Sequence, residues 1–211
     1  MNLARLKESR RLLHPSTWRW FLLTATNGAY APLFQSLAVS NRDRFKDPVP
    51  WFAWHSFPVL AEEVKARTGG KLLEWGSGAS TAYYVSNGLK VTAFEHIPGW
   101  ADMLRDALKA KGLEADIRVT APEAYARPDL DPGEFSIFVI DGRERSACAG
   151  WLAEAIQAGR VGPGTLIIFD DSQRPRYAEA IALLARLCKR QATYTGPTSL
   201  DLDKATTFFW V

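Results

Sequence analysis

Two stretches of the chain place carboxylates and arginines directly after apolar runs. Asp141 is followed by Arg143 and Arg145, and a second apolar run ends at the pair Asp170 and Asp171. Carboxylates in such a setting accept a proton from a nucleophile or coordinate a cation. Arginines bind carboxylates and phosphates through paired hydrogen bonds. The two stretches are therefore candidates for the place where a polar substrate is bound and activated.

The charge of these three carboxylates leaves several interpretations open. Close carboxylates cannot all stay ionised unless a cation or arginines neutralise them. Mg²⁺ bound by Asp141, Asp170 and Asp171 is one source of positive charge, since Mg²⁺ prefers oxygen ligands. Arginines are a second source, with spare guanidinium groups left for an anionic substrate, and solvated surface ion pairs are a third interpretation. We favour the arginines. The candidate substrate-binding residues are Arg143, Arg145 and Arg174, with Arg176 nearby.

A third stretch combines an acid with a glycine-rich turn. An apolar run at 71–75 is broken by Gly76 and Gly78, and a helical pattern begins at Ala79. Glycines allow a tight turn and a close approach of a ligand to the main chain, and a helix start offers unpaired N–H groups. A strand, a glycine turn and a helix in this order are typical of a nucleotide-binding loop.

The residues of this loop distinguish between nucleotides. A dinucleotide-binding loop has a third glycine, but Thr81 stands at that position. Glu74 beside the loop would repel a pyrophosphate and suits a ligand with an ammonium or sulfonium group. Glu95, about twenty residues further on, would bind the hydroxyls of any adenosine ribose and does not discriminate. The loop therefore favours a nucleoside that carries an amino acid.

The hydrophobic pattern alternates between strands and helices from residue 71 onward. Nearly continuous apolar runs such as 135–140 are typical of strands buried on both faces of a parallel sheet. Repeated strand–helix units predict an α/β fold, and ligands bind at the carboxyl ends of such strands. We expect a doubly wound, mostly parallel seven-stranded sheet with an antiparallel C-terminal strand. Strands are predicted at 71–75, 91–95, 115–119, 135–141, 164–170, 192–196 and 205–211, and helices at 56–67, 79–87, 98–111, 146–159 and 176–190.

These motifs, taken in order over about residues 55–211, resemble the Rossmann-like S-adenosylmethionine-dependent methyltransferases. The residues that carry the resemblance are Glu74, Gly76, Gly78, Ser80 and Thr81, then Phe94, Glu95, His96 and Trp100, then 139–143, then 168–172. The resemblance implies S-adenosylmethionine as the cofactor. It implies that Gly76 and Gly78 pass under the methionine part, that Glu74 helps to hold the ammonium, and that Glu95 binds the ribose. The turn at 120–123 would flank the adenine. The implied cofactor-binding set is Glu74, Gly76, Ser77, Gly78, Ser80, Thr81, Glu95, His96, Ala121, Glu123 and Asp141.

The resemblance implies methyl transfer to an oxygen or nitrogen nucleophile of a small substrate, of anionic or sugar-like chemistry. Asp141 would lie near the methyl group and serve as general base, with Asp171 and His55 as further candidates. A Mg²⁺ site formed by Asp141, Asp170 and Asp171 would resemble the metal site of the catechol-type O-methyltransferases. Those enzymes have a lysine as general base three residues after the first acid, where this chain has Glu144, so Mg²⁺ is not favoured. The alternatives are an NAD(P)-dependent oxidoreductase and a non-catalytic cofactor- or partner-binding domain.

Composition and length limit the remaining possibilities. The 211 residues predict one domain at 51–211, preceded by an N-terminal helical extension and linker at 1–50. Residues 1–40 are basic and rich in tryptophan, but polar residues interrupt them, so peripheral contact with a membrane is open and a spanning helix is not expected. A net charge of +3 does not indicate nucleic acid as a partner. Cys148 and Cys188 have neither metal-ligand nor disulfide spacing, which favours a reducing cytoplasm.

Overall fold

The computed structural model describes most of the predicted domain. The predicted extension at 1–50 and its candidate membrane-contact segment at 1–40 lie almost wholly outside the described residues. Val49, which is described, is buried in the core of the domain. No helix in the described part of the chain is long and apolar enough to cross a membrane. The described residues are 45, 48–196, 198 and 204–211.

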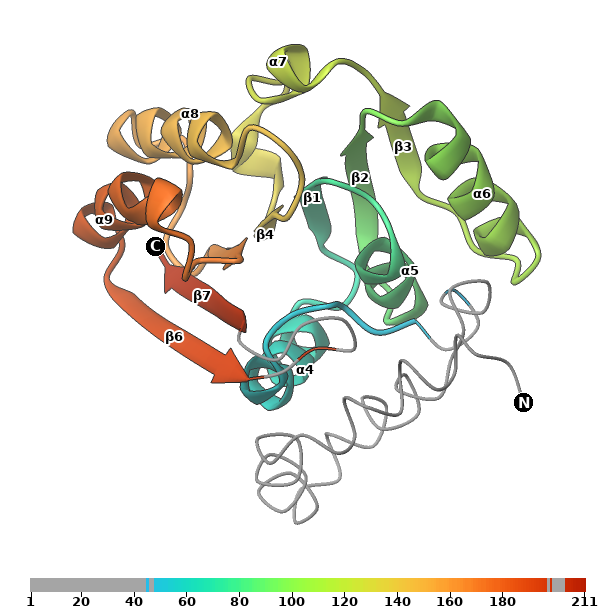
Figure 1. The fold of residues 1–211 in the computed structure, drawn as a ribbon, viewed down its shortest axis with the longest axis horizontal. Helices are drawn as coiled ribbons and strands as arrows, with labels where there is room; N and C mark the ends of the chain where they lie inside the picture. The colour runs from blue at the N-terminus through green and yellow to red at the C-terminus, as the bar shows by residue number, and fades with distance from the viewer. Residues whose placement is uncertain (1–44, 46–47, 197, 199–203) are drawn as a thin grey trace.

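A single seven-stranded sheet forms the centre of the fold, with the strand order β3-β2-β1-β4-β5-β7-β6 (Figure 1). Neighbouring pairs among β1 to β5 are parallel, and β7 runs antiparallel to both β5 and β6. The chain order reverses between β1 and β4, which is the topological switch point where open α/β sheets bind ligands. The strands are β1 (Lys71–Trp75), β2 (Lys90–Glu95), β3 (Asp116–Val119), β4 (Ile137–Ile140), β5 (Leu166–Asp170), β6 (Arg190–Gly196) and β7 (Lys204–Trp210).

Helices cover both faces of the sheet, so the fold is doubly wound as predicted. One face is covered by α4 (Phe57–Ala66), α5 (Ala79–Ser86) and α6 (Pro98–Lys109), and the apolar residues of these helices cluster together with alternate residues of the strands. The opposite face is covered by α7 (Pro122–Tyr125), α8 (Arg145–Gln157) and α9 (Ala178–Leu187). Figure 1 shows α8 and α9 side by side over this second face.

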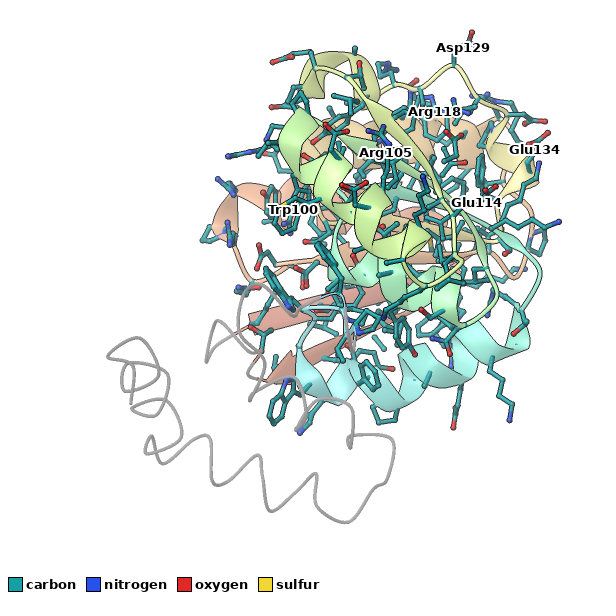
Figure 2. The ribbon with its side chains drawn as sticks, turned by 90° about the vertical axis from the view of Figure 1, so that its right-hand side faces the viewer. Trp100, Arg105, Glu114, Arg118, Asp129 and Glu134 are labelled. Atoms are coloured by element: carbon teal, nitrogen blue, oxygen red, sulfur yellow. The ribbon has the colours of Figure 1, made fainter. Side chains whose placement is uncertain are left out.

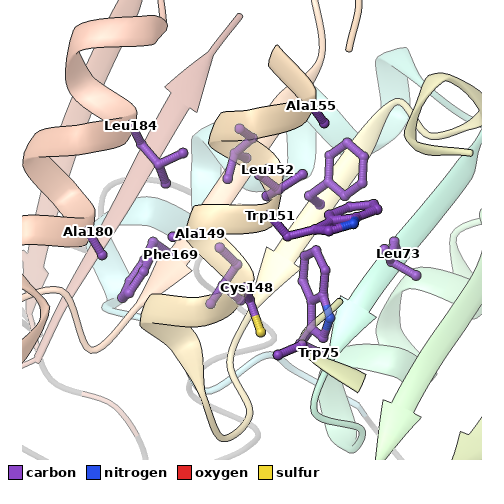
Figure 3. Close-up of a cluster of buried hydrophobic side chains, with 14 of the residues drawn as sticks. Leu73, Trp75, Cys148, Ala149, Trp151, Leu152, Ala155, Phe169, Ala180 and Leu184 are labelled. Carbon is purple, nitrogen blue, oxygen red and sulfur yellow. The ribbon is translucent and has the colours of Figure 1, made fainter. Parts of the chain in front are cut away.

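Alternate residues of each strand point to opposite faces of the sheet and contribute to two separate hydrophobic cores. Leu72 of β1 faces α4 and α5, whereas Leu73 and Trp75 face α8 and α9. In the second core the rings of Trp75 and Trp151 meet edge to face with centroids 5.7 Å apart, and Cys148 lies close by (Figure 3). The same alternation decides which side of the sheet each site residue faces.

The predicted order and type of the elements are confirmed, and most of the differences are at their ends. The helix predicted at 176–190 is α9 alone, preceded by a 3-10 turn, η4 (Pro175–Tyr177). The predicted turn at 120–123 is instead the start of the short helix α7, which Pro122 opens by fixing φ in the helical range. Ser56 precedes α4, but its hydroxyl donates to the carbonyl of Ala53 (2.7 Å) and does not cap the helix.

Candidate functional site

Two adjoining cavities lie at the carboxyl ends of the strands. The larger has a volume of about 540 Å³ and is lined by the segments that follow β1, β2, β4 and β5. The smaller, of about 210 Å³, lies between Trp51 and the start of α5. Ser77, Trp100 and Asp141 line both cavities. Trp100, labelled in Figure 2, lies in the first turn of α6, and its indole Nε1 donates to the carbonyl of Ser77 (2.7 Å). The volume of the larger cavity is in the range that encloses a small-molecule ligand.

Glycines bring the loops after β1 and β4 into direct contact. Gly76 has a φ of +96°, and a Cβ there would lie 2.9 Å from the Cα of Gly142. A Cβ at Gly142 would in turn lie 2.8 Å from the backbone nitrogen of Gly76. At distances this short, a side chain at either position would force the backbone of the two loops apart. The glycine turn predicted as a ligand loop is therefore also a packing contact between the two halves of the site.

Glu74 is hydrogen-bonded to the residues that follow the glycine loop and lines neither cavity. It is fully buried, on the α5 side of the sheet, and accepts hydrogen bonds from the hydroxyls of Ser80 and Thr81. The Thr81 hydroxyl also accepts from the backbone N–H of Gly78 (2.9 Å), so Glu74 is linked to the loop through one side chain. Burial raises the pKa of Glu74 from 4.5 to about 7. Glu74 and Thr81 thus fix the shape of the loop, and the structure does not bring Glu74 to the cavity surface.

Glu95 ends β2 at the wall of the larger cavity. Its Oε2 accepts from the backbone N–H (3.2 Å) and the hydroxyl (3.0 Å) of Ser77. Its Oε1 accepts from the backbone N–H groups of His96 (2.8 Å) and Ile97 (2.9 Å), and the imidazole Nδ1 of His96 lies 2.9 Å from the same oxygen. These contacts hold the carboxylate in one orientation at the cavity wall. A ligand hydroxyl could take the place of the Ser77 hydroxyl.

A buried guanidinium joins the acids that follow β4 and β5. Arg145, with its side chain 8% exposed, donates through Nε to the Gly142 carbonyl (3.0 Å) and through Nη1 to the carbonyl of Asp170. Its Nη2 donates to the carbonyl (2.8 Å) and to Oδ1 (3.0 Å) of Asp141, and Nη1 lies 3.2 Å from Oδ2 of Asp171. Arg145 was a predicted substrate-binding residue. In the structure its donors are committed to the protein, because α8 begins at this residue and directs the side chain toward β5.

Two more cations complete this cluster. Lys204, at the start of β7, places Nζ 2.6 Å from Oδ2 of Asp170 and 3.5 Å from Oδ1 of Asp171. Arg174 pairs with Oδ2 of Asp171 (2.7 Å). Burial raises the pKa of Asp170 well above its ordinary value, and Lys204 and Arg145 act in the opposite direction. Lys204 is absent from the sequence prediction, because nothing in the local sequence shows that β7 pairs with β5.

The geometry supports charge neutralisation by basic side chains over a metal site. Three carboxylates, Asp141, Asp170 and Asp171, meet three cations, Arg145, Arg174 and Lys204. In the described part of the chain no group of His, Cys, Asp or Glu side chains is arranged to hold a metal ion. The three acids named as weak candidates for magnesium binding therefore form ion pairs with basic side chains of the protein.

Asp141 differs from the other two acids because it lines both cavities. Its side chain is 26% exposed, and Oδ1 is held by Arg145, while no protein partner of Oδ2 is recorded among the described residues. Asp171, in contrast, is buried by its cations and has a left-handed φ of +56°. Glu144, also at positive φ (+48°), is the other non-glycine residue of this kind in the described chain. Both line the larger cavity, and backbone strain of this kind is often kept at functional sites.

Three predicted site residues lie away from the cavities. His55 lies in the 3-10 turn η2 (Trp54–Ser56), where it packs beside the end of β6, and burial lowers its pKa. Ala121 and Glu123 are exposed at the start of α7. The other predicted residues line one or both cavities, except Glu74, Thr81 and Asp170, which are buried behind them. Trp51 and Tyr177 line the cavities as well and were missed, since an isolated aromatic residue gives no signal in the sequence.

Comparison with known proteins links this architecture to solved structures. No protein-family profile and no curated protein matches the sequence. A putative O-methyltransferase from Klebsiella pneumoniae matches with a TM-score of 0.61 at 18% identity, over 92% of this chain and 96% of that chain. An O-methyltransferase from Bacillus cereus in complex with S-adenosylhomocysteine matches with a TM-score of 0.56 at 16% identity, over 86% and 91%. A 16S ribosomal RNA guanine methyltransferase from T. thermophilus matches with a TM-score of 0.53 at 18% identity, over 77% and 43%. The chain therefore has the Rossmann-like fold of the S-adenosylmethionine-dependent methyltransferases.

Proposed function

We propose that the protein is an S-adenosylmethionine-dependent methyltransferase that acts on an oxygen or nitrogen nucleophile of a small molecule. The observation that carries this proposal is the placement of Glu95, the glycine loop and Asp141 around one cavity at the switch point of the sheet. Glu95 offers a carboxylate to ribose hydroxyls, and Asp141 offers a partly exposed carboxylate across the cavity. The unpaired thiols of Cys148 and Cys188 agree with a cytoplasmic location.

The residues at the cavities fit the proposed cofactor. A Cβ added at Gly78 would meet only the ring of Trp100, at 3.6 Å, so packing within the protein does not require a glycine there. Gly78 lines the smaller cavity at the start of α5, where the N–H groups of the first helical turn have no partner within the helix. That space suits a methionine carboxylate, and Glu95 with Ser77 suits the ribose. S-adenosylmethionine would supply a methyl group activated by a positively charged sulfur.

Asp141 is the proposed general base. Arg145 anchors its Oδ1 and places a positive charge beside the carboxylate. The other oxygen, Oδ2, is then available to accept the proton from a hydroxyl or amine of the acceptor. Asp171 is less suited to this role, because Arg145, Arg174 and Lys204 surround its carboxylate.

The alternatives explain fewer of these features. A dinucleotide-dependent oxidoreductase is disfavoured because β7 lies antiparallel between β5 and β6, where dinucleotide-binding sheets are parallel. The buried Thr81 also occupies the position of the third glycine and is hydrogen-bonded to Glu74. A non-catalytic binding domain would have no need for strained residues and a partly exposed acid in the cavity. Several of the matched structures are RNA methyltransferases, but a cavity of about 540 Å³ suits a small acceptor.

Calorimetric titration of the full chain with S-adenosylmethionine and S-adenosylhomocysteine tests the proposal. Both are expected to bind, and NAD is not; binding of NAD alone would replace the proposal by the oxidoreductase. A panel of small hydroxyl and amine compounds, assayed with labelled cofactor, then identifies an acceptor.

The role of Asp141 is tested with that acceptor. Asp141→Asn should lower methyl transfer by about 10²–10⁴-fold, the usual contribution of a general base, while S-adenosylhomocysteine still binds. Asp129→Asn, at an exposed acid far from the cavity lining (Figure 2), is the matched control and should leave transfer unchanged. An Asp141→Asn variant with normal turnover would exclude the base role.

A further inference from the structure

One half of the larger cavity is lined by four arginines that differ in burial and in whether they form ion pairs. Arg145 is buried and fully engaged, and Arg174 is paired with Asp171. Arg143 and Arg176 are exposed, line the same cavity and form no ion pair with any acid in the described part of the chain. Because Asp141, Asp170 and Asp171 are already matched by three cations, these two guanidinium groups are not needed to neutralise them.

The backbone that carries Arg143 is held on both sides. The preceding residue, Gly142, packs against Gly76, and Arg145 two residues later is clamped to Asp141. The backbone N–H of Arg143 also donates to the hydroxyl of Tyr125 (2.6 Å). The side chain of Arg143 therefore extends from a fixed point into the cavity. An arginine held in this way loses less freedom on binding a ligand than one on a mobile loop.

Arg176 has a comparable support in η4. Pro175, the first residue of η4, has its own φ fixed by its ring and so limits the backbone before Arg176. The guanidinium of Arg176 lies over the ring of Tyr177, 4.7 Å from the ring centroid. Tyr177 is itself buried against Phe169, with ring centroids 5.3 Å apart. Stacking on a fixed ring orients the planar guanidinium and leaves its N–H donors free at the edge.

The start of α8 adds to the positive potential of this half. The 13-residue helix begins at Arg145, and the following residue, Ser146, is exposed and lines the cavity. A helix N-terminus favours an anion through its dipole and its free N–H groups. Glu144 is an opposing charge here, since it is exposed and lines the cavity too, but one carboxylate does not balance two arginines.

We propose that Arg143 and Arg176 form an anion subsite that binds a carboxylate or phosphate group of the methyl acceptor. This inference rests on the proposed function and extends it, because it defines the acceptor as a small anionic molecule. The anionic group binds on the β4–β5 half of the cavity, and the nucleophile of the same molecule is presented to Asp141, two residues from Arg143. The glycine loop and Glu95 on the other half remain available to the cofactor.

The subsite is tested by calorimetric titration of the full chain saturated with S-adenosylhomocysteine, using inorganic phosphate and malonate as probes. At least one probe is expected to bind. Arg143→Gln and Arg176→Gln should each weaken that binding about tenfold, as loss of one charge-assisted hydrogen-bonding group does. The two substitutions together should abolish it. Preference for phosphate would indicate a phosphate ester as acceptor, and preference for malonate a carboxylic acid.

A matched control and a cofactor measurement make the result decisive. Arg160→Gln removes an exposed arginine at the opposite end of the sheet, in the turn between α8 and β5, and should leave probe binding unchanged. The affinity for S-adenosylhomocysteine should be the same in all variants. The subsite would be refuted if neither probe bound, if Arg160→Gln weakened binding as much, or if Arg143→Gln weakened cofactor binding equally.

Two further outcomes remain distinguishable. If S-adenosylhomocysteine itself does not bind, the proposed function fails, and with it the inference that depends on it. If a short single-stranded RNA displaces the probe with a steep salt dependence, the arginines contact a nucleic-acid backbone and the small-molecule acceptor is refuted.

Discussion

Replacing Arg145 tests whether the arginine is a structural clamp or a substrate ligand. In Arg145→Gln the guanidinium that donates to three backbone carbonyls and to Asp141 is lost. Among the described residues, Asp170, which is fully buried, and Asp171 then keep Lys204 and the half-exposed Arg174 as counter-charges. Removal of one partner of a buried ion pair costs about 3–5 kcal/mol, because the remaining charge is left buried. A loss of this size is a large part of a typical unfolding free energy of about 5–15 kcal/mol.

Guanidinium chloride denaturation at pH 7 measures the loss directly, and thermal unfolding should show a midpoint lowered by about 10 °C. Arg127→Gln is the matched control, because Arg127 pairs with Glu154 on the surface with its side chain 53% exposed. Such exposed pairs contribute about 0.2–1 kcal/mol. Equal effects of the two substitutions would refute the clamp and return Arg145 to the substrate-binding role that the sequence suggested.

The pH dependence gives a second measure of the same effect. Burial raises the pKa of Asp170, and loss of a neighbouring cation raises it further. The variant should therefore recover stability relative to the wild type as the pH falls and the carboxylates take up protons. Adding Asp170→Asn to Arg145→Gln should restore part of the lost stability, with a coupling energy of about 0.5–3 kcal/mol. Strict additivity would show that the two residues do not interact.

Three further predictions concern β1 and the loop that follows it. The pKa of Glu74 is raised from 4.5 to about 7, so Glu74 lowers stability progressively as the pH rises between these values, because only the unfolded chain ionises there. Glu74→Gln should remove about 3 kcal/mol of that pH-dependent change in unfolding titrations; an unchanged pH profile would show that Glu74 ionises normally. Gly76→Ala should destabilise the fold by about 2 kcal/mol or more, since a Cβ there meets Gly142 at 2.9 Å. Gly78→Ala should fold normally but bind S-adenosylhomocysteine about tenfold more weakly, by overfilling the smaller cavity. Equal loss of stability in both alanine variants would contradict the assignment of Gly76 to packing and of Gly78 to ligand binding.

The order of elements and the region of the site could be predicted from the sequence, because both follow from local pattern. The runs at Ile137–Ile140 and Leu166–Asp170 are apolar at almost every position, and such strands must be buried on both faces. Parallel strands joined by helices have their carboxyl ends at one edge of the sheet, so the acids that follow them meet there. This rule predicts that Glu95, Asp141 and Asp171 lie at one edge of the sheet, and all three line the larger cavity.

The role of each charged residue was decided only by the tertiary structure. Arg143 and Arg145 are the same residue type two positions apart, and both line the larger cavity. Arg145 is buried and paired with Asp141 and Asp171, whereas Arg143 is exposed and has no acidic partner among the described residues. Lys204 reaches Asp170 because β7 inserts antiparallel beside β5, a pairing between residues far apart in the chain. Glu74 faces α5 because alternate residues of a strand point to opposite sides of a sheet, and this places its carboxylate under the glycine loop. Local sequence determines which elements form and where they end, whereas the partner of a buried charge depends on contacts between elements that sequence spacing does not encode.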